Sequence, residues 1–224
     1  MRTTTRAAGL VAAALLWAGA ATAITLGQSD DFDGGSTDGW SSGVAHPVPP
    51  VGVPDGGPGG DGDGWLQLTA LGGFGAGGKL VAFAGPQWLG DWLAAGVTAI
   101  RMDVRNAGPE DLDLRLLLAG PGVSAISADA VVVAAGVDWT AVVFDLRPEA
   151  LTGQPLLALA DVQDLRLFHA AAPLYPGDPV QAVLGIDRVT AAPELAPAAL
   201  LAAGMLTLLA ARRRAVRGAN RRTT

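Results

Sequence analysis

Acidic residues supply most of the side chains in this sequence that could bind an ion or move a proton. The 224 residues include 21 Asp and Glu, two histidines and no cysteine. Asp61-Gly62-Asp63-Gly64 has an acid spacing that suits calcium, which prefers oxygen ligands, although the rest of an EF-hand loop is missing. Simple solvation of these acids within a long loop is the alternative interpretation.

The sequence contains no recognisable catalytic motif. Neither His46 nor His169 lies in a nucleophile motif, and Gly-x-Ser-x-Gly is absent. The Gly-rich stretches lack the lysine and Ser/Thr ending of a phosphate-binding loop. Two of the many acids could form a glycosidase pair, but the sequence singles out none. We expect His169, at the end of an alternating strand, to be a partly buried structural residue.

Three aromatic residues are candidates for a sugar-stacking platform, because flat apolar rings can pack against a pyranose face. They are Trp88, Trp92 and Tyr175. The alternative is that these rings anchor the core or the loops, which is the commoner role of aromatic residues in a β-sandwich.

Charge is distributed unevenly along the chain. Arginines gather near both ends, whereas 20 of the 21 acids lie between Ile24 and Ala191, together with only seven basic residues. A body of this charge should repel nucleic acid, so we expect no nucleic-acid partner. The excess of acids indicates either solubility or cation binding.

Alternation with a period of two predicts an all-β fold. Ile100, Met102 and Val104 alternate with charged residues, and Leu112 to Leu118 repeats the pattern after Asn106-Ala-Gly-Pro, which predicts a central antiparallel hairpin. About nine such strands predict an antiparallel β-sandwich of jelly-roll type over residues 24–191. Residues 46–64, rich in Pro and Gly, are expected to form a surface loop.

The N-terminal segment has the features of a signal peptide. Arg2 and Arg6 precede the apolar run of residues 7–20, and Ala21-Thr22-Ala23 provides a small-x-small cleavage site at Ala21 and Ala23. Residues 1–23 are therefore expected to be removed on export. An uncleaved membrane anchor is the alternative.

The C-terminal segment, residues 192–224, predicts a membrane helix. Residues 195–211 carry no charge and are followed by an arginine cluster over 212–222, so the domain should face outward and the tail inward. Pro193, Glu194 and Pro197 precede the helix, and the whole arrangement resembles a PEP-CTERM sorting signal, with Leu195 where the second proline is expected. This resemblance implies an exosortase-type processing enzyme as a partner. A plain C-terminal anchor is the alternative.

The order of motifs in the body also resembles a known family. An acidic-Phe-acidic start, a strand WTAVVFDL, the closing Ile-Asp-Arg-Val and the piece from Gln87 to Gly120 resemble galactose-binding-like jelly rolls, and specifically laminin B (laminin IV type A) domains. The resemblance implies an extracellular sandwich used in adhesion or carbohydrate binding. It also implies a structural calcium ion joining the first strand to the last, with Asp33 and Asp187 as ligands and Asp31 beside them. Ordinary solvated acids are the alternative.

Together these patterns predict an exported, surface-associated module, not an enzyme, that binds extracellular polysaccharide or matrix. A secreted jelly-roll glycan hydrolase and a purely structural envelope protein are the alternatives. The sequence predicts cell-surface or matrix localisation, reached through the C-terminal signal.

Overall fold

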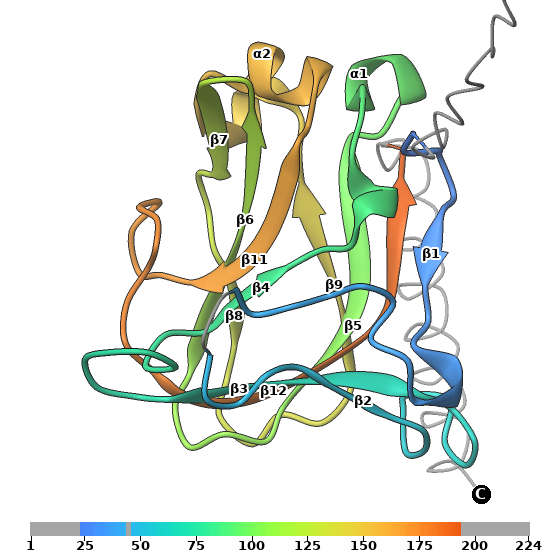
Figure 1. Cartoon of the computed structure of the whole chain (residues 1–224), viewed down its shortest axis with the longest axis vertical. Coiled ribbons are helices and arrows are strands. Elements are labelled where there is room, and N and C mark those ends of the chain that lie inside the picture. The colour runs from blue at the N-terminus through green and yellow to red at the C-terminus, as the bar shows by residue number, and fades with distance from the viewer. Residues whose placement is uncertain (1–22, 44–45, 194–224) are drawn as a thin grey trace, which may run out of the picture.

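The computed structural model describes residues 23–43 and 46–193, which form two antiparallel β-sheets packed face to face (Figure 1). Sheet A contains β1 (Ser29–Asp30), β2 (Val51–Val53), β3 (Trp65–Leu71), β5 (Ala99–Asn106), β9 (Thr140–Asp145) and β12 (Gln181–Ala192). Sheet B contains β4 (Val81–Phe83), β6 (Leu112–Gly120), β7 (Val123–Ser127), β8 (Val131–Val133), β10 (Leu151–Gly153) and β11 (Asp164–His169).

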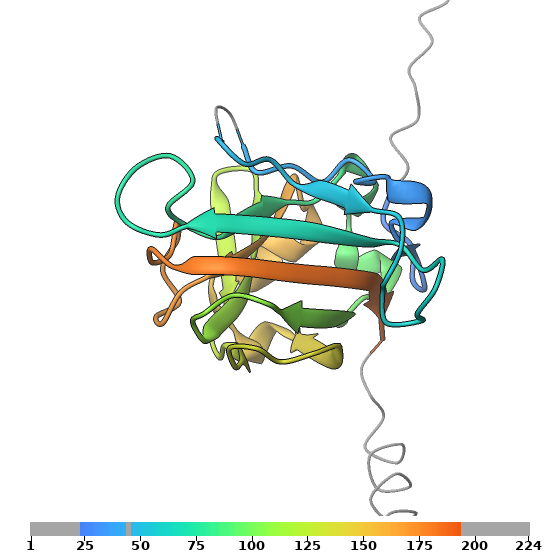
Figure 2. The ribbon, with the colours of Figure 1, turned by 90° about the horizontal axis from the view of Figure 1, so that it is seen from below.

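Strand order identifies the sandwich as a jelly roll. Sheet A runs β2-β3-β12-β5-β9 with β1 also paired to β12, and sheet B runs β10-β7-β6-β11-β4 with β8 also paired to β6. Without β1, β2, β8 and β10, four strands remain in each sheet, in the orders β3-β12-β5-β9 and β7-β6-β11-β4, which is the arrangement of an eight-stranded jelly roll. The all-β prediction is confirmed. Figure 2 shows β3 and β12 side by side in sheet A.

Helical turns are few and short. The α-helices are α1 (Trp92–Ala95) and α2 (Pro155–Ala160), which lie beside one another at one end of the sandwich (Figure 1). Three 3-10 turns connect strands, namely η1 (Asp33–Gly35), η2 (Pro86–Trp88) and η3 (Pro148–Ala150).

The predicted central hairpin is wrong, although both of its strands exist. β5 pairs with β12 and β9 in sheet A, whereas β6 pairs with β7, β8 and β11 in sheet B. The connection after Asn106 therefore crosses between the sheets. The buried side-chain amide of Asn106 stabilises this connection. Its Nδ2 group donates to the carbonyl oxygen of Glu110 at 2.8 Å, and its Oδ1 atom accepts from Gly108 N at 3.0 Å.

The predicted inward faces of both strands are confirmed. Ile100, Met102 and Val104 on β5 and the even-numbered leucines of β6 are buried in the common core. On β6 the opposite face is also covered at Arg115, one of the polar positions that alternate with the leucines. The Arg115 guanidinium is buried and donates to the carbonyl oxygens of Ala170 at 2.9 Å and Ala171 at 2.8 Å, so the charge is surrounded by acceptors.

A buried carboxylate fastens the first strand to the rest of the domain. Asp30 Oδ2 accepts hydrogen bonds from Trp40 Nε1 at 2.7 Å, Trp88 Nε1 at 2.6 Å and Gln87 Nε2 at 2.9 Å. Burial raises the pKa of Asp30, while the three donors oppose that rise. The charge thus joins β1 to η2 and to the segment around Trp40.

The Pro/Gly-rich stretch, residues 46–64, is a loop for only part of its length. It contains β2, which pairs with β3 from Val51 opposite Gln67 to Val53 opposite Trp65. The stretch as a whole contains few apolar residues, which argued against a strand. However, β2 is short and lies at the edge of sheet A, where short strands are common. The remainder is held by its own acids, with Asp55 Oδ1 accepting from Gly62 N at 2.6 Å.

Several predicted segments lie outside the described residues. These are most of the signal peptide, including Ala21, and the tail from Glu194 onward, including Pro197, whereas Pro193 is exposed at the end of β12. Within residues 23–43 and 46–193, no helix is both long and apolar enough to cross a bilayer.

Candidate functional site

Two tryptophans lie on the outer face of sheet A, away from the core. Strand register places Gly185 of β12 between Gln67 of β3 and Arg105 of β5. A glycine in mid-strand often marks the close approach of another group. Here a Cβ atom on Gly185 would lie 2.9 Å from the Trp139 ring and 3.0 Å from the Trp65 ring. Both indoles therefore extend over Gly185, where any larger residue would displace them.

The geometry of this pair is fixed by the loop that precedes β3. The ring centroids of Trp65 and Trp139 are 5.7 Å apart at an interplanar angle of 78°, an edge-to-face arrangement. Trp65 Nε1 donates to the carbonyl oxygen of Asp55 at 2.9 Å, and Trp139 Nε1 donates to that of Gly56 at 3.2 Å. Both rings are partly exposed. Since their only polar atoms are bonded, the surface that they offer to a ligand is apolar carbon.

Polar side chains surround the pair on the same face. The Arg105 guanidinium carbon lies 6.0 Å from the centroid of Trp65, within the range of a cation–π contact. Gln67 and Thr69 follow Trp65 at intervals of two along β3, so all three share one side of the strand. We use "tryptophan face" for Trp65, Trp139, Arg105, Gln67 and Thr69. Flat apolar rings bordered by hydrogen-bonding groups are suited to a ligand with both apolar and hydroxylated surfaces.

Asp187 lies beside the tryptophan face and has no hydrogen-bond partner. It pairs across the sheet with Asp103, and its carboxylate is fully buried with both oxygens unbonded. Burial, with smaller contributions from the charges of Asp63 and Asp103, raises the pKa of Asp187 to about 7, although the backbone N–H and the charge of Arg188 act to lower it. Arg188 Nε is 3.6 Å from Asp187 Oδ2 but 2.8 Å from Asp103 Oδ2. An orphaned buried carboxylate of this kind calls for a proton or a cation.

The predicted calcium ligands are only partly brought together. Asp33 Oδ1 accepts from Gly64 N at 3.1 Å, which places Asp33 next to the segment that carries Asp63. Asp31 Oδ1 instead accepts from Asp33 N at 3.3 Å within its own exposed turn. Among residues 23–43 and 46–193, no three His, Asp or Glu side chains are close enough to share one ion. A calcium ion shared by Asp33 and Asp187, with Asp31 beside them, therefore stays a prediction, and of these three carboxylates Asp187 is the buried one with unbonded oxygens.

The predicted sugar platform of Trp88, Trp92 and Tyr175 is wrong, because two of its rings are core. Trp88 and Trp92 are both 0% exposed, with centroids 6.2 Å apart. Tyr175 lies elsewhere, against Phe168 at 5.6 Å and under the Arg166 guanidinium at 4.5 Å on sheet B. The alternative reading, that these aromatics anchor the structure, is correct for both tryptophans.

Trp65 and Trp139 were missed by sequence reasoning. The available signal was Gly185 in the middle of the closing strand, which indicates a large neighbour but does not say which one. His169 fulfils its predicted structural role, since its Nδ1 accepts from Asp113 N at 2.9 Å, and burial lowers the pKa of its imidazole.

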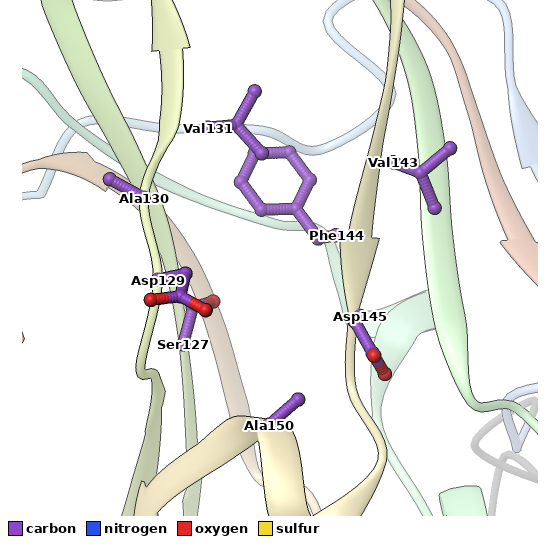
Figure 3. A pocket seen from close by; sticks show the side chains of 8 residues that line it. All are labelled: Ser127, Asp129, Ala130, Val131, Val143, Phe144, Asp145 and Ala150. Carbon is purple, nitrogen blue, oxygen red and sulfur yellow. The ribbon is translucent and has the colours of Figure 1, made fainter.

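A cavity of about 220 Å³ opens between the edges of the two sheets (Figure 3). Ser127 and Asp129 line one wall and Asp145 lies on the opposite strand, with Phe144 between them. Arg147 Nη2 is 2.6 Å from Asp145 Oδ2 and holds the pKa of that carboxyl below its usual value. The Ser127 hydroxyl is engaged with the backbone of Leu116. Two carboxylates, Asp129 and Asp145, thus line the cavity, and Asp145 is ion-paired with Arg147.

Comparisons with known proteins give structural neighbours only. No family model and no curated protein matches the chain, so both family resemblances remain predictions. A family 11 carbohydrate-binding module of a Clostridium thermocellum cellulosomal cellulase is similar, with a TM-score of 0.46, 11% identity, and coverage of 76% of this chain and 98% of that one. The same kind of module in complex with a β-1,3-1,4-mixed-linked tetrasaccharide has a TM-score of 0.44 at 14% identity, covering 76% and 99%.

An exo-β-agarase is also similar, with a TM-score of 0.48 and 11% identity over 66% of this chain. The match spans only 22% of the agarase.

Proposed function

We propose that this chain is a non-catalytic glycan-binding module, exported and held at the cell surface by its C-terminal segment, with the tryptophan face as its binding surface. The observation that carries the proposal is the pair of partly exposed indoles fixed over Gly185. Their Nε1 groups are already bonded to the loop, so a ligand would meet apolar ring surface. A pyranose ring, with an apolar face and a rim of hydroxyls, matches that surface and its polar border.

The tethering part of the proposal rests on the sequence. Residues 195–211 are uncharged and are followed by Arg212-Arg213-Arg214, an arrangement that favours membrane insertion with the domain outside. An exosortase-type enzyme acting near Pro193-Glu194 would release the domain to the surface or matrix. Without such cleavage the segment would remain an anchor.

We also propose calcium as a structural cofactor, with Asp187 as its carboxylate ligand. A bound cation would neutralise the two unbonded oxygens of this buried group. Calcium commonly completes its coordination with backbone carbonyls and water, so the ion does not require three acidic side chains. It would stabilise the corner where β12 meets the segment around Asp63.

The hydrolase alternative is less well supported by the geometry. Asp187 has the raised pKa, near 7, that a glycosidase acid needs. However, its carboxylate is fully buried, so a glycosidic oxygen could not approach within hydrogen-bonding distance. A binding role needs only the tryptophan face.

Replacing either tryptophan should weaken glycan binding. Affinity electrophoresis through soluble mixed-linked β-glucan, agarose-derived oligosaccharides and a panel of bacterial exopolysaccharides would first identify a ligand. For that ligand, we expect Trp139→Ala and Trp65→Ala each to raise Kd about 30-fold, the effect of losing roughly 2 kcal/mol at a binding hot spot. Melting curves of each variant would show whether the fold is retained.

Tyr175→Ala is the matched control, because Tyr175 is an exposed aromatic residue that packs against sheet B. It should leave Kd unchanged. Gly185→Ala provides a second test, since its methyl group would displace both rings without removing them. Folded tryptophan variants that bind as tightly as the unaltered chain would rule out this surface, and hydrolysis products in the mixture would favour the enzyme alternative.

A further inference from the structure

The chain leaves the described domain at one end of the sandwich, beside α1. Ala192, the last residue of β12, pairs with Ala99, and its carbonyl oxygen accepts from Thr98 N at 3.0 Å. The start of the domain lies at the same end, since Ile24 N donates to the carbonyl oxygen of Leu89 at 2.9 Å. Both apolar segments of the sequence, residues 7–20 and 195–211, are therefore connected to this end.

The same end carries four exposed leucines. Leu93 lies on α1 and is 43% exposed, while Leu156 and Leu157 on α2 are 60% and 59% exposed. Leu26, 48% exposed, is in the turn whose Gly27 N donates to Ala191 O at 2.8 Å. We use "leucine end" for these four residues. Figure 1 shows α1 and α2 together at the top, with the start of the described chain close to α1.

The length of the connection limits how far this end can lie from a membrane. Ala192 is fixed in the sheet and the uncharged stretch begins at Leu195. Three residues span at most about 11 Å when fully extended. The headgroup layer on each side of a bilayer is roughly 5–8 Å thick. If residues 195–211 insert, the end of β12, at the same end of the sandwich as these leucines, must therefore lie at the headgroup layer.

We infer that the leucine end is a membrane-contacting face that rests on the neutral phospholipid of the bilayer into which the tail inserts. This inference rests on the tethering part of the proposed function. The carboxylates of Asp91 and Asp161 adjoin α1 and α2 and are exposed. Contact is therefore driven by the apolar side chains, which enter the interface, and anionic lipid does not strengthen it.

The face fixes the orientation of the domain. The Gly-rich turn of residues 72–78 extends from the opposite part of the sandwich (Figure 1). Phe74 in that turn is fully exposed. Phe74 thus provides an apolar comparison site that should remain in water while the leucine end is covered.

Site-specific labelling can test this face, because the chain has no native cysteine. The full chain carrying Leu157→Cys or Phe74→Cys would be labelled with an environment-sensitive fluorophore and placed in phosphatidylcholine nanodiscs, one chain to a disc. We expect quenching by aqueous iodide to be several-fold weaker at position 157 than at position 74. Adding phosphatidylglycerol should not increase the protection.

Lengthening the connection between the domain and the tail distinguishes two explanations for protection: attraction of the leucine end to lipid, and a short connection that holds it near the bilayer. Ten Gly/Ser residues inserted after Pro193 should leave Leu157→Cys protected, whereas the same insertion combined with Leu93→Ser and Leu156→Ser should abolish protection. Loss of protection on lengthening alone would overturn the inference, as would equal quenching at both positions in disc-bound protein. Protection that depends on protein concentration would indicate a second copy and would overturn it too. Protein that fails to float with the discs would instead overturn the tethering itself, and this face with it.

Discussion

Asp30→Ala should lower the free energy of unfolding by about 3–5 kcal/mol, because three buried or partly buried donors would lose their common acceptor. Trp40 Nε1, Trp88 Nε1 and Gln87 Nε2 all bind the same Asp30 oxygen. Trp40 and Trp88 are buried, so their Nε1 groups would be left without an acceptor, whereas Gln87 Nε2 would keep its hydrogen bond to Asp38 O at 2.7 Å. Urea denaturation followed by tryptophan fluorescence would measure the loss, since two of the donors are themselves fluorescent.

Asp30→Asn is the matched control for this prediction. Its amide oxygen can replace the carboxylate oxygen as an acceptor, but without the charge that strengthens the hydrogen bonds. We expect the asparagine variant to lose about half as much stability as the alanine variant. Equal losses would mean that the negative charge, not the acceptor, holds the cluster together.

Asp187 should make the calcium-free protein less stable as the pH rises from about 4 to about 7. The pKa of Asp187 is about 7 in the folded chain, compared with 3.8 as its ordinary value. Between these values the folded chain holds a proton that the unfolded chain lacks, so stability falls as pH rises. The stabilisation from this proton is fully present below pH 3.8 and is lost above about pH 7. At about 1.4 kcal/mol per pKa unit, the change could reach ~4 kcal/mol.

Thermal melts in EDTA across this pH range, compared between the unaltered chain and Asp187→Asn, isolate the effect of this one group. The asparagine variant cannot ionise there, so it should be the more stable protein at pH 8 and should lack this part of the pH dependence. Parallel curves for the two proteins would show that Asp187 is already paired or solvated.

Calcium should reverse the loss at high pH if Asp187 is its ligand. At a hundredfold excess over Kd, an ion that binds only the folded state adds about 2.7 kcal/mol, which corresponds to a Tm increase of roughly 5–10 °C for a domain of this size. The increase should be larger at pH 8 than at pH 5, because protons compete for the carboxylate. It should be absent in Asp187→Asn. A calcium shift that survives this substitution would place the ion elsewhere.

Local pattern predicted the strands well but not their partners. Alternation identified the buried sides of β5 and β6 because side-chain direction depends only on position along the strand. The same pattern cannot encode which sheet a strand joins. Asn106-Ala-Gly-Pro is equally compatible with a hairpin turn and with a crossing between sheets, and the structure has the crossing.

The candidate site shows a similar limit. Trp88 and Trp92 are large apolar residues with no pattern to show whether they are buried, and packing alone decides that they form core. Trp65 on β3 and Trp139, which directly precedes β9, are brought together over Gly185 from parts of the chain far apart in sequence. Asp187 was predicted as a ligand from its family resemblance, but the resemblance did not show that the turn after β1 bonds Asp31 to Asp33 N.

The central place of β12 in sheet A has a consequence for how the domain is made. β12 is the last strand of the described chain, yet it lies between β3 and β5 and also pairs with β1. A ribosome or a translocation pore delivers residues in order, so the edges of β3 and β5 that face each other stay unpaired until residues 181–192 emerge. Such long-range pairing slows folding and leaves strand edges open to other chains. Sheet A of the domain therefore stays incomplete, and accessible to chaperones, until almost the whole domain has been synthesised or translocated.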